Sequence, residues 1–134
     1  MKLFEKMKIF GRKSLGEKGE ELATDYLKKR GFSVLERNFK NRKGYNIGEI
    51  DIVAEKEGEI VFVEVKTREL EKYENTLPEE NISHKKLLKL SRISQIYLKA
   101  RGWQDRNYRF DAVSVWISTD SKKAKLKHIP SIFI

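Results

Sequence analysis

The sequence predicts a single α/β domain in which helices flank a mixed β-sheet. Two segments with apolar residues at helical spacing alternate with five strand-like runs, in the order α-β-β-β-α-β-β. With 134 residues and 39% hydrophobic residues, the chain can build one such core but not two. We expect this domain over residues 14–134. Residues 1–13 form a basic segment, which is either a loosely packed, mobile terminus or an arm that grips phosphate groups.

The first helix is expected over residues 16–30, and Gly31 follows where a helix stop belongs. Apolar positions recur in it at helical spacing, at Leu22, Ala23, Tyr26 and Leu27. A short strand is then expected over residues 32–39, in which Leu35 falls out of step with the alternation. A polar, basic loop follows over residues 40–46.

Two strongly alternating runs come next, over residues 49–54 and 60–66, and together they predict a β-hairpin. The turn of this hairpin is centred on Glu57-Gly58. Residues 67–82 are polar and lack periodicity, so we expect a mobile loop there.

A second helix is expected over residues 84–101, with Ser83 as its N-cap and Gly102 at its end. One side of this helix carries Leu87, Leu90, Ile93, Ser94 and Tyr97. Two further strands are expected over residues 109–117 and 124–129, which completes a mixed sheet flanked by helices.

The even-length turn of the hairpin fixes which residues face one another, because facing residues have numbers with a constant sum. Asp51 is therefore expected opposite Glu64, and Glu49 opposite Lys66. Side chains alternate along a strand, so these four project from one face of the hairpin. Three acids and one lysine then share a patch.

The charge of the chain favours a polyanionic partner, since 29 Lys and Arg residues against 20 Asp and Glu give a formal charge of +9. No apolar run approaches the roughly 20 residues that a spanning helix needs, and no signal-peptide pattern opens the chain. We therefore expect a cytoplasmic protein that binds nucleic acid and no membrane. The absence of Cys excludes disulfides, thiolate metal sites and Cys nucleophiles.

The acidic patch is costly as structure alone, because like charges across a sheet repel and strands rich in Val and Ile are expected to be partly buried. Hard divalent cations such as Mg²⁺ neutralise such a patch, since they prefer carboxylate oxygens. A bound metal polarises a phosphoryl group and activates water, and Lys66 can stabilise the developing charge. The residues alone leave two interpretations open: this metal centre, or a solvated ion-pair cluster.

Asp51 followed by Glu64-Val65-Lys66 resembles the D…(D/E)xK signature of restriction-endonuclease-like nucleases, in which the acids bind metal and the lysine assists hydrolysis. The segments around this motif resemble the YraN family of predicted endonucleases: residues 16–23 (GEKGEELA), 48–51 (GEID), 61–68 (VFVEVKTR), 86–98 and 109–113 (RFDAV). The resemblance covers almost everything after residue 15. It implies a restriction-endonuclease-like fold and a metal-dependent endonuclease that acts on nucleic acid, with DNA favoured and branched DNA as one candidate.

The wider fold group includes archaeal Holliday-junction resolvases, whose first helix contributes a glutamate to the metal site. This implies that Glu20, Asp51 and Glu64 bind Mg²⁺ or Mn²⁺ while Lys66 assists the attacking water. Helical geometry agrees, because Glu20 lies at the edge of the apolar stripe and Glu21 points away from it. An acid that only compensates the helix dipole is the alternative for Glu20.

The competing function is a non-catalytic nucleic-acid binding or adaptor protein on the same fold, and the oligomeric state stays open between monomer and homodimer. A basic stripe lies along the second helix, where it either follows a phosphate backbone or forms a solvated face: Lys85, Lys89, Arg92 and Lys99. Further candidates for nucleic-acid binding border the hairpin: Arg42, Lys43 and Arg68. Lys86 matches a basic position of the family but lies off the stripe.

The remaining polar candidates receive lesser roles. Glu49 is expected to be either an additional ligand or an ion-pair partner of Lys66, and Asp111 to form structural hydrogen bonds. His84 and His128 are isolated from each other in the sequence, so we expect neither to be catalytic. No glycine-rich loop ends in the Gly-Lys-Ser/Thr pattern of a nucleoside triphosphatase.

Overall fold

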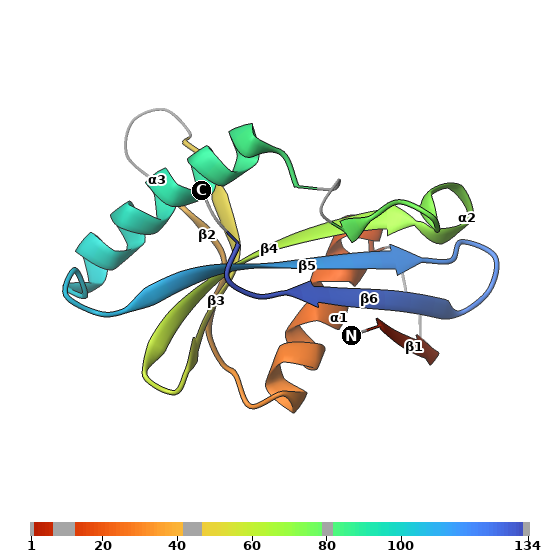
Figure 1. The fold of residues 1–134 in the computed structure, drawn as a ribbon, viewed down its shortest axis with the longest axis horizontal. Helices are drawn as coiled ribbons and strands as arrows, with labels where there is room; N and C mark the ends of the chain where they lie inside the picture. The colour runs from red at the N-terminus through yellow and green to blue at the C-terminus, as the bar shows by residue number, and fades with distance from the viewer. Residues whose placement is uncertain (1, 7–12, 42–46, 79–81, 133–134) are drawn as a thin grey trace.

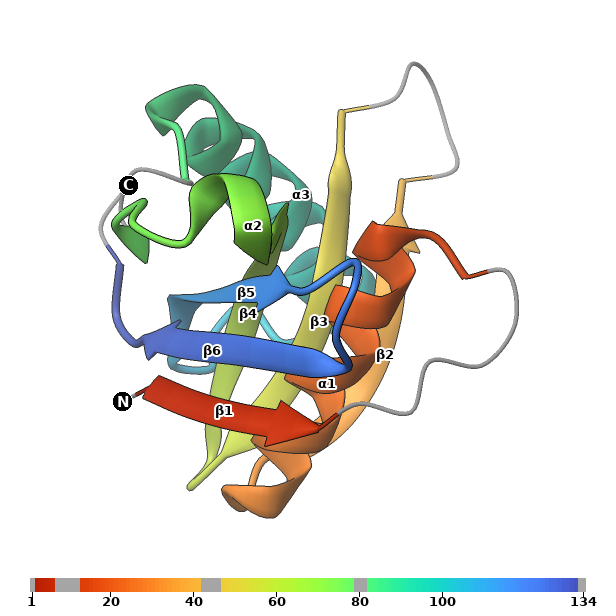
Figure 2. The same ribbon diagram turned by 90° about the vertical axis from the view of Figure 1, so that its right-hand side faces the viewer.

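A six-stranded sheet with a helix on each face forms the body of the protein (Figures 1 and 2). The computed structural model describes residues 2–6, 13–41, 47–78 and 82–132. The elements follow one another as β1 (Lys2–Lys6), α1 (Leu15–Lys29), β2 (Ser33–Lys40), β3 (Glu49–Lys56), β4 (Glu59–Glu69), α2 (Leu70–Tyr73), α3 (His84–Arg101), β5 (Tyr108–Ile117) and β6 (Lys123–Ile129).

The strand order in the sheet is β1-β6-β5-β4-β3-β2. Neighbouring strands pair antiparallel except β4 and β5, which run parallel and are joined by the crossover through α3. The mixed sheet flanked by helices is therefore confirmed, with the core strands and long helices in the predicted order. In the described part of the chain, no helix is long and apolar enough to cross a membrane.

Helix α1 begins at a capping box, in which the Ser14 hydroxyl accepts from the Glu17 amide and the Glu17 carboxylate accepts from the Ser14 amide. It ends before Gly31, whose φ of +89° is in the left-handed region that glycine adopts without a steric cost. The predicted first helix is confirmed at both ends within a residue or two.

The hairpin register is also confirmed. Residues Ile52 and Val63 are partners, as are Lys56 and Glu59, so facing numbers share one sum throughout the ladder. The two turn residues, Glu57 and Gly58, have φ values of +51° and +80°. A two-residue turn of this kind matches the twist of the flanking strands and holds the register in place.

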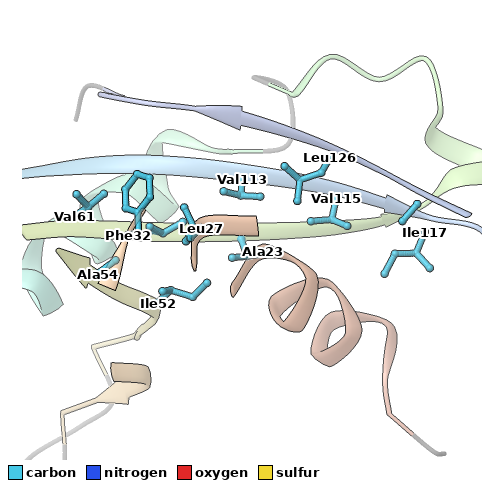
Figure 3. Packing of buried hydrophobic residues seen from close by; sticks show 13 residues of the cluster. Ala23, Leu27, Phe32, Ile52, Ala54, Val61, Val113, Val115, Ile117 and Leu126 are labelled. Carbon is cyan, nitrogen blue, oxygen red and sulfur yellow. The ribbon is translucent and has the colours of Figure 1, made fainter. Parts of the chain in front are cut away.

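Two hydrophobic layers enclose the central strands. Ala23 and Leu27 of α1 pack on one face of the sheet against residues such as Val113, with Phe32 closing one end (Figure 3). On the other face, α3 places Leu90, Ile93 and Tyr97 against β3 and β4. Helices cover both faces of the central strands, and the buried positions of β3 and β4 are accordingly rich in Val and Ile.

Two elements were not predicted from the sequence. Strand β1 pairs antiparallel with β6 inside the basic segment over residues 1–13, and residues 7–12 lie outside the described residues. The loop expected over residues 67–82 begins instead with the end of β4 and helix α2. The parallel partner β5 extends β4 as far as Glu69, and the Trp116 ring nitrogen donates to the Tyr73 carbonyl oxygen at 2.8 Å, which anchors α2.

Candidate active site

Three carboxylates meet beside the first part of β3. One oxygen each from Glu20, Glu49 and Asp51 lies within 4.8 Å of the others, and all three side chains are half-buried. We call these residues the acid cluster. Helix α1 supplies Glu20, while β3 supplies Glu49 and Asp51 two residues apart.

Close packing of α1 on β4 places Glu20 in this cluster. A β-carbon added at Gly19 would lie 1.8 Å from the Thr67 hydroxyl oxygen and 2.8 Å from the Thr67 β-carbon. The helix can approach the strand this closely only because residue 19 has no side chain. Ala23 and Leu27, both fully buried, fix the same helix on the sheet one and two turns further along.

A backbone amide of the neighbouring strand holds Asp51. The ladder between β3 and β4 ends at Ile52 and Val63, and beyond it the Asp51 Oδ2 atom accepts from the Val65 amide at 2.8 Å. Asp51 and Glu64, which were predicted to face each other, lie one position beyond this ladder, so their pairing stays a prediction. Glu64 is close enough that its negative charge contributes to raising the pKa of Asp51.

Burial and crowding of negative charge make the acids hard to ionise. Burial, followed by the charge of Glu64, raises the pKa of Asp51 to about 8, against the opposing hydrogen bond from Val65. Burial raises the pKa of Glu64 to about 7, although Lys86 and Lys66 oppose the shift. The pKa of Glu20 is raised by burial and then by Glu49. The protein alone therefore stabilises the ionised forms of these carboxylates poorly. A cation bound among them would favour the ionised forms.

Asn38 connects two members of the acid cluster from β2. With its amide nitrogen turned toward the acids, Asn38 donates to Glu20 at 2.7 Å and to Glu49 at 3.2 Å. Its φ of +56° is in the left-handed region, which Asn tolerates better than other residues that have a side chain. Sequence reasoning missed this residue, and an Asn inside a strand, where it is disfavoured, was the one available signal.

Glu49 pairs with a different lysine from the one expected. Its Oε2 atom lies 3.3 Å from the Lys40 Nζ atom, and the two residues face each other across β2 and β3. Among the described residues, Glu49 forms an ion pair with Lys40 and none with Lys66, so the predicted alternative of a pair with Lys66 is wrong. The pairing of β2 with β3 places Lys40 directly across from Glu49. The expectation that Glu49 is an additional metal ligand stays a prediction, and the position of Glu49 in the acid cluster favours this role.

Lys66 lies on β4, two residues after Glu64, and is half-buried. Its pKa is lowered, first by burial and then by the positive charge of Lys86. Lys86, in the first turn of α3, and Lys66 both lower the pKa of Glu64. The fold therefore brings a second cation to this site, at a residue that sequence reasoning left outside the basic stripe.

The residues predicted to bind nucleic acid are only partly described. Arg42 and Lys43 lie outside the described residues. The Arg68 guanidinium group lies 4.6 Å from the centre of the Tyr73 ring. The α3 stripe is exposed at each of its members: Lys85, Lys89, Arg92 and Lys99. A β-carbon at Gly48 would lie 3.7 Å from the Lys89 β-carbon, so Lys89 lies next to the start of β3, the strand that carries Glu49 and Asp51.

Asp111 has the structural role that was expected. It is fully buried and lies 2.8 Å from a ring nitrogen of His128, and it also accepts from the Ser131 amide at 2.9 Å and from Arg109 at 3.0 Å. The other ring nitrogen of His128 lies 3.1 Å from the Tyr26 hydroxyl oxygen. This network fastens α1 and the residues after β6 to β5.

The chain is similar to proteins of the family UPF0102. The model of the uncharacterised protein family UPF0102 matches residues 19–115, a segment that contains every acid of the cluster. A UPF0102 protein of Caldanaerobacter subterraneus subsp. tengcongensis is 37% identical over 128 residues, which cover 95% of this chain and 100% of that relative. A UPF0102 protein of Syntrophomonas wolfei subsp. wolfei is 40% identical over 121 residues, covering 90% and 98%. One from Persephonella marina is 43% identical over 100 residues, covering 75% and 81%.

Proposed function

This chain belongs to the uncharacterised protein family UPF0102, also called YraN, and we propose that it is a metal-dependent hydrolase of phosphodiester bonds in nucleic acid, with DNA as the favoured substrate. The observation that supports this most strongly is the acid cluster of Glu20, Glu49 and Asp51. Its carboxylates are half-buried, and Glu64 beside them adds further charge. Carboxylates this close together repel one another, and a bound cation would neutralise them.

The chemistry of the donor set fits Mg²⁺ or Mn²⁺. All of the candidate ligands are carboxylates, which these hard cations prefer, and neither a thiolate nor an imidazole lies among them. We propose Glu20, Asp51 and Glu64 as ligands, with Glu49 as a further one. The metal would supply Lewis-acid polarisation of the phosphate and a water of lowered pKa.

Two lysines supply positive charge where the reaction creates negative charge. Lys66 is half-buried and near Glu64, so it can stabilise charge on the phosphate or orient the attacking water. Lys86 contributes to the same field from the first turn of α3. A lysine held in place near the reacting phosphate stabilises charge more strongly than one in bulk water, because the site is partly dry.

The exposed stripe on α3 provides a path for the substrate backbone. Lys85, Lys89 and Arg92 are exposed on the helix that carries Lys86, and Lys89 lies beside Gly48 at the start of β3. A phosphate backbone that follows these residues would pass next to the acid cluster. Contacts of this kind carry no base sequence, so we propose recognition of backbone and shape.

Cleavage assays test this function. Purified protein is incubated with plain duplex, single-stranded, nicked and branched DNA, and with RNA, in Mg²⁺ or in Mn²⁺. We expect at least one substrate to be cut, and Glu64→Gln and Lys66→Ala to lower the rate by about 100-fold or more. Asp25→Asn is the matched control, since Asp25 is exposed on α1 and neutralising it should leave the rate unchanged.

Two results would contradict the proposal: no substrate is cut in either metal, or the variants cut as fast as the wild type. DNA binding that neither metal nor Asp51→Asn changes would support the adaptor protein instead.

A further inference from the structure

A hollow of about 700 Å³ lies between β2 and the second half of α3. Four of the residues that line the hollow are apolar and partly or fully exposed, and we call them its floor: Phe39, Ile47, Ile96 and Ala100. Its volume is within the range of small-molecule sites, which is about 300–1,000 Å³. An apolar surface of this kind can contact the apolar face of a ligand.

The hollow adjoins the acid cluster. Asn38 and Lys40 line it, and the same two side chains contact Glu49, one through its amide and the other at 3.3 Å through its ammonium group. A nucleotide whose phosphate lies at the acid cluster therefore has its base or sugar within reach of the hollow. The hollow therefore neighbours the site proposed for hydrolysis, and Asn38 and Lys40 lie between the two.

Among the residues that the structure describes, several polar side chains that line the hollow already have partners within the protein. The Asn38 amide donates to two acids, and the Asn41 side-chain oxygen accepts from the Ile47 amide at 3.1 Å. Glu36, which also lines the hollow, accepts from Arg101 at 2.6 Å. An occupant is therefore held mainly through apolar contact with the floor rather than by hydrogen bonds that would select one base.

A nucleobase fits these apolar residues because it has a flat apolar face. It is also attached to a charged backbone, which can extend toward the acid cluster. In a duplex, that face is covered by the neighbouring base pairs, so only an unpaired and unstacked base can enter. The Phe39 ring makes an edge contact with Tyr97, with ring centres 5.0 Å apart, and this contact fixes the aromatic part of the floor.

We propose that the hollow binds an unpaired nucleobase next to the phosphate to be cut, without preference for base sequence. This inference rests on the proposed function and names its substrate class: nucleic acid with unpaired nucleotides, such as single strands, flaps and gaps. Sequence tolerance follows because every base has an apolar face.

Filling the hollow tests the proposal. Ala100 is exposed, so Ala100→Phe should close the hollow and leave the fold intact, as a melting temperature within a few degrees of wild type would verify. The control is Gln104→Phe, which adds the same ring at an exposed position after α3, away from the hollow lining. Binding is measured by fluorescence anisotropy in EDTA, so that no metal is present.

Two probes separate base contacts from backbone charge: an oligomer of thymidine nucleotides, and an abasic oligomer of the same length and charge. We expect wild type and Gln104→Phe to prefer the thymidine oligomer by about 5-fold or more, and Ala100→Phe to lose this preference. Equal binding of both probes by the wild type, or an unchanged preference in Ala100→Phe, would overturn the proposal. If DNA is still cut in the cleavage assay, that result rejects the hollow alone and leaves the hydrolase proposal standing.

Discussion

At the scale of single residues, the surroundings of Asp51 support the proposed cation site. Its carboxylate is half-buried near Glu64 and accepts a hydrogen bond from the Val65 amide. Folding therefore places a carboxylate where the protein stabilises its ionised form poorly, which supports the proposal that Asp51 is a metal ligand.

The first prediction concerns the stability of Asp51→Asn. A folded pKa of about 8, above the unfolded value of about 3.9, means that the metal-free protein loses stability as pH rises from about 4 to 8. The Asn side chain keeps an oxygen for the Val65 amide and removes the charge. We expect the variant to be more stable than wild type by about 1 kcal/mol or more at pH 8 in EDTA, and less so at pH 5.

Urea unfolding at the two pH values measures this difference. Mn²⁺ should stabilise the wild type and not the variant, because the cation binds the ionised carboxylate of the folded state. A variant that is less stable than wild type at pH 8 without metal would show that Asp51 is a structural acid.

The second prediction separates two properties of Asn38: the amide that contacts Glu20 and Glu49, and the left-handed backbone conformation. Asn38→Gly removes the amide that bridges Glu20 and Glu49 but tolerates the left-handed φ, whereas Asn38→Ala removes the amide and adds about 1 kcal/mol of backbone strain. We expect both variants to bind Mn²⁺ about 10-fold more weakly, as calorimetric titration would measure. Normal metal affinity in Asn38→Gly would assign the residue a backbone role alone.

At the scale of elements, the contact between α1 and β4 decides where Glu20 lies. Gly19→Ala would drive a methyl group into Thr67, so α1 must move away from the strand. We expect a loss of about 1–3 kcal/mol in the free energy of unfolding and weaker Mn²⁺ binding, since the displaced helix carries Glu20.

Gly16→Ala is the matched control on the same helix, because nothing lies within 4 Å of the added carbon. It should be neutral or stabilise by up to about 1 kcal/mol, because alanine favours helix more than glycine does. Urea unfolding and calorimetry measure both variants. Equal effects of the two substitutions would mean that close packing at Gly19 does not position the acid.

Helix α3 carries the basic stripe that we propose to contact nucleic acid, and salt dependence tests this role. If Lys85, Lys89 and Arg92 contact phosphates, replacing any one by Ser should weaken binding of all DNA sequences alike. It should also reduce the slope of log affinity against log salt by about 1. Lys28→Ser is the control, since Lys28 is exposed on α1, on the opposite face of the sheet. An unchanged slope in all three α3 variants would identify the stripe as a solvated face.

At the scale of the whole molecule, local signals predicted the hairpin and its two flanking helices, and pairing of distant segments supplied the rest. A two-residue turn at Glu57-Gly58 fixes its own register, so the ladder from Ile52 and Val63 to the turn could be predicted from the sequence. Strand β2 contains a register shift between Val34 and Glu36, which explains why Leu35 falls out of step.

The contacts with the acids that were not predicted arise where segments distant in the sequence meet. Asn38 and Lys40 reach the acids only because β2 pairs with β3, and Lys86 reaches Glu64 only because α3 crosses back over the sheet. Strand β1 depends on the edge of β6, more than a hundred residues away in the sequence. Local spacing carries no information about such contacts.

The most direct test of the central claim is the rate of DNA cleavage as a function of Mn²⁺ concentration, measured for wild type, Asp51→Asn and the Asp25→Asn control. We predict a saturable, metal-dependent rate for wild type and the control, and a rate lower by about 100-fold or more for Asp51→Asn. Cleavage that persists in EDTA, or an Asp51→Asn rate equal to that of the wild type, would contradict the assignment of this site to metal-dependent hydrolysis.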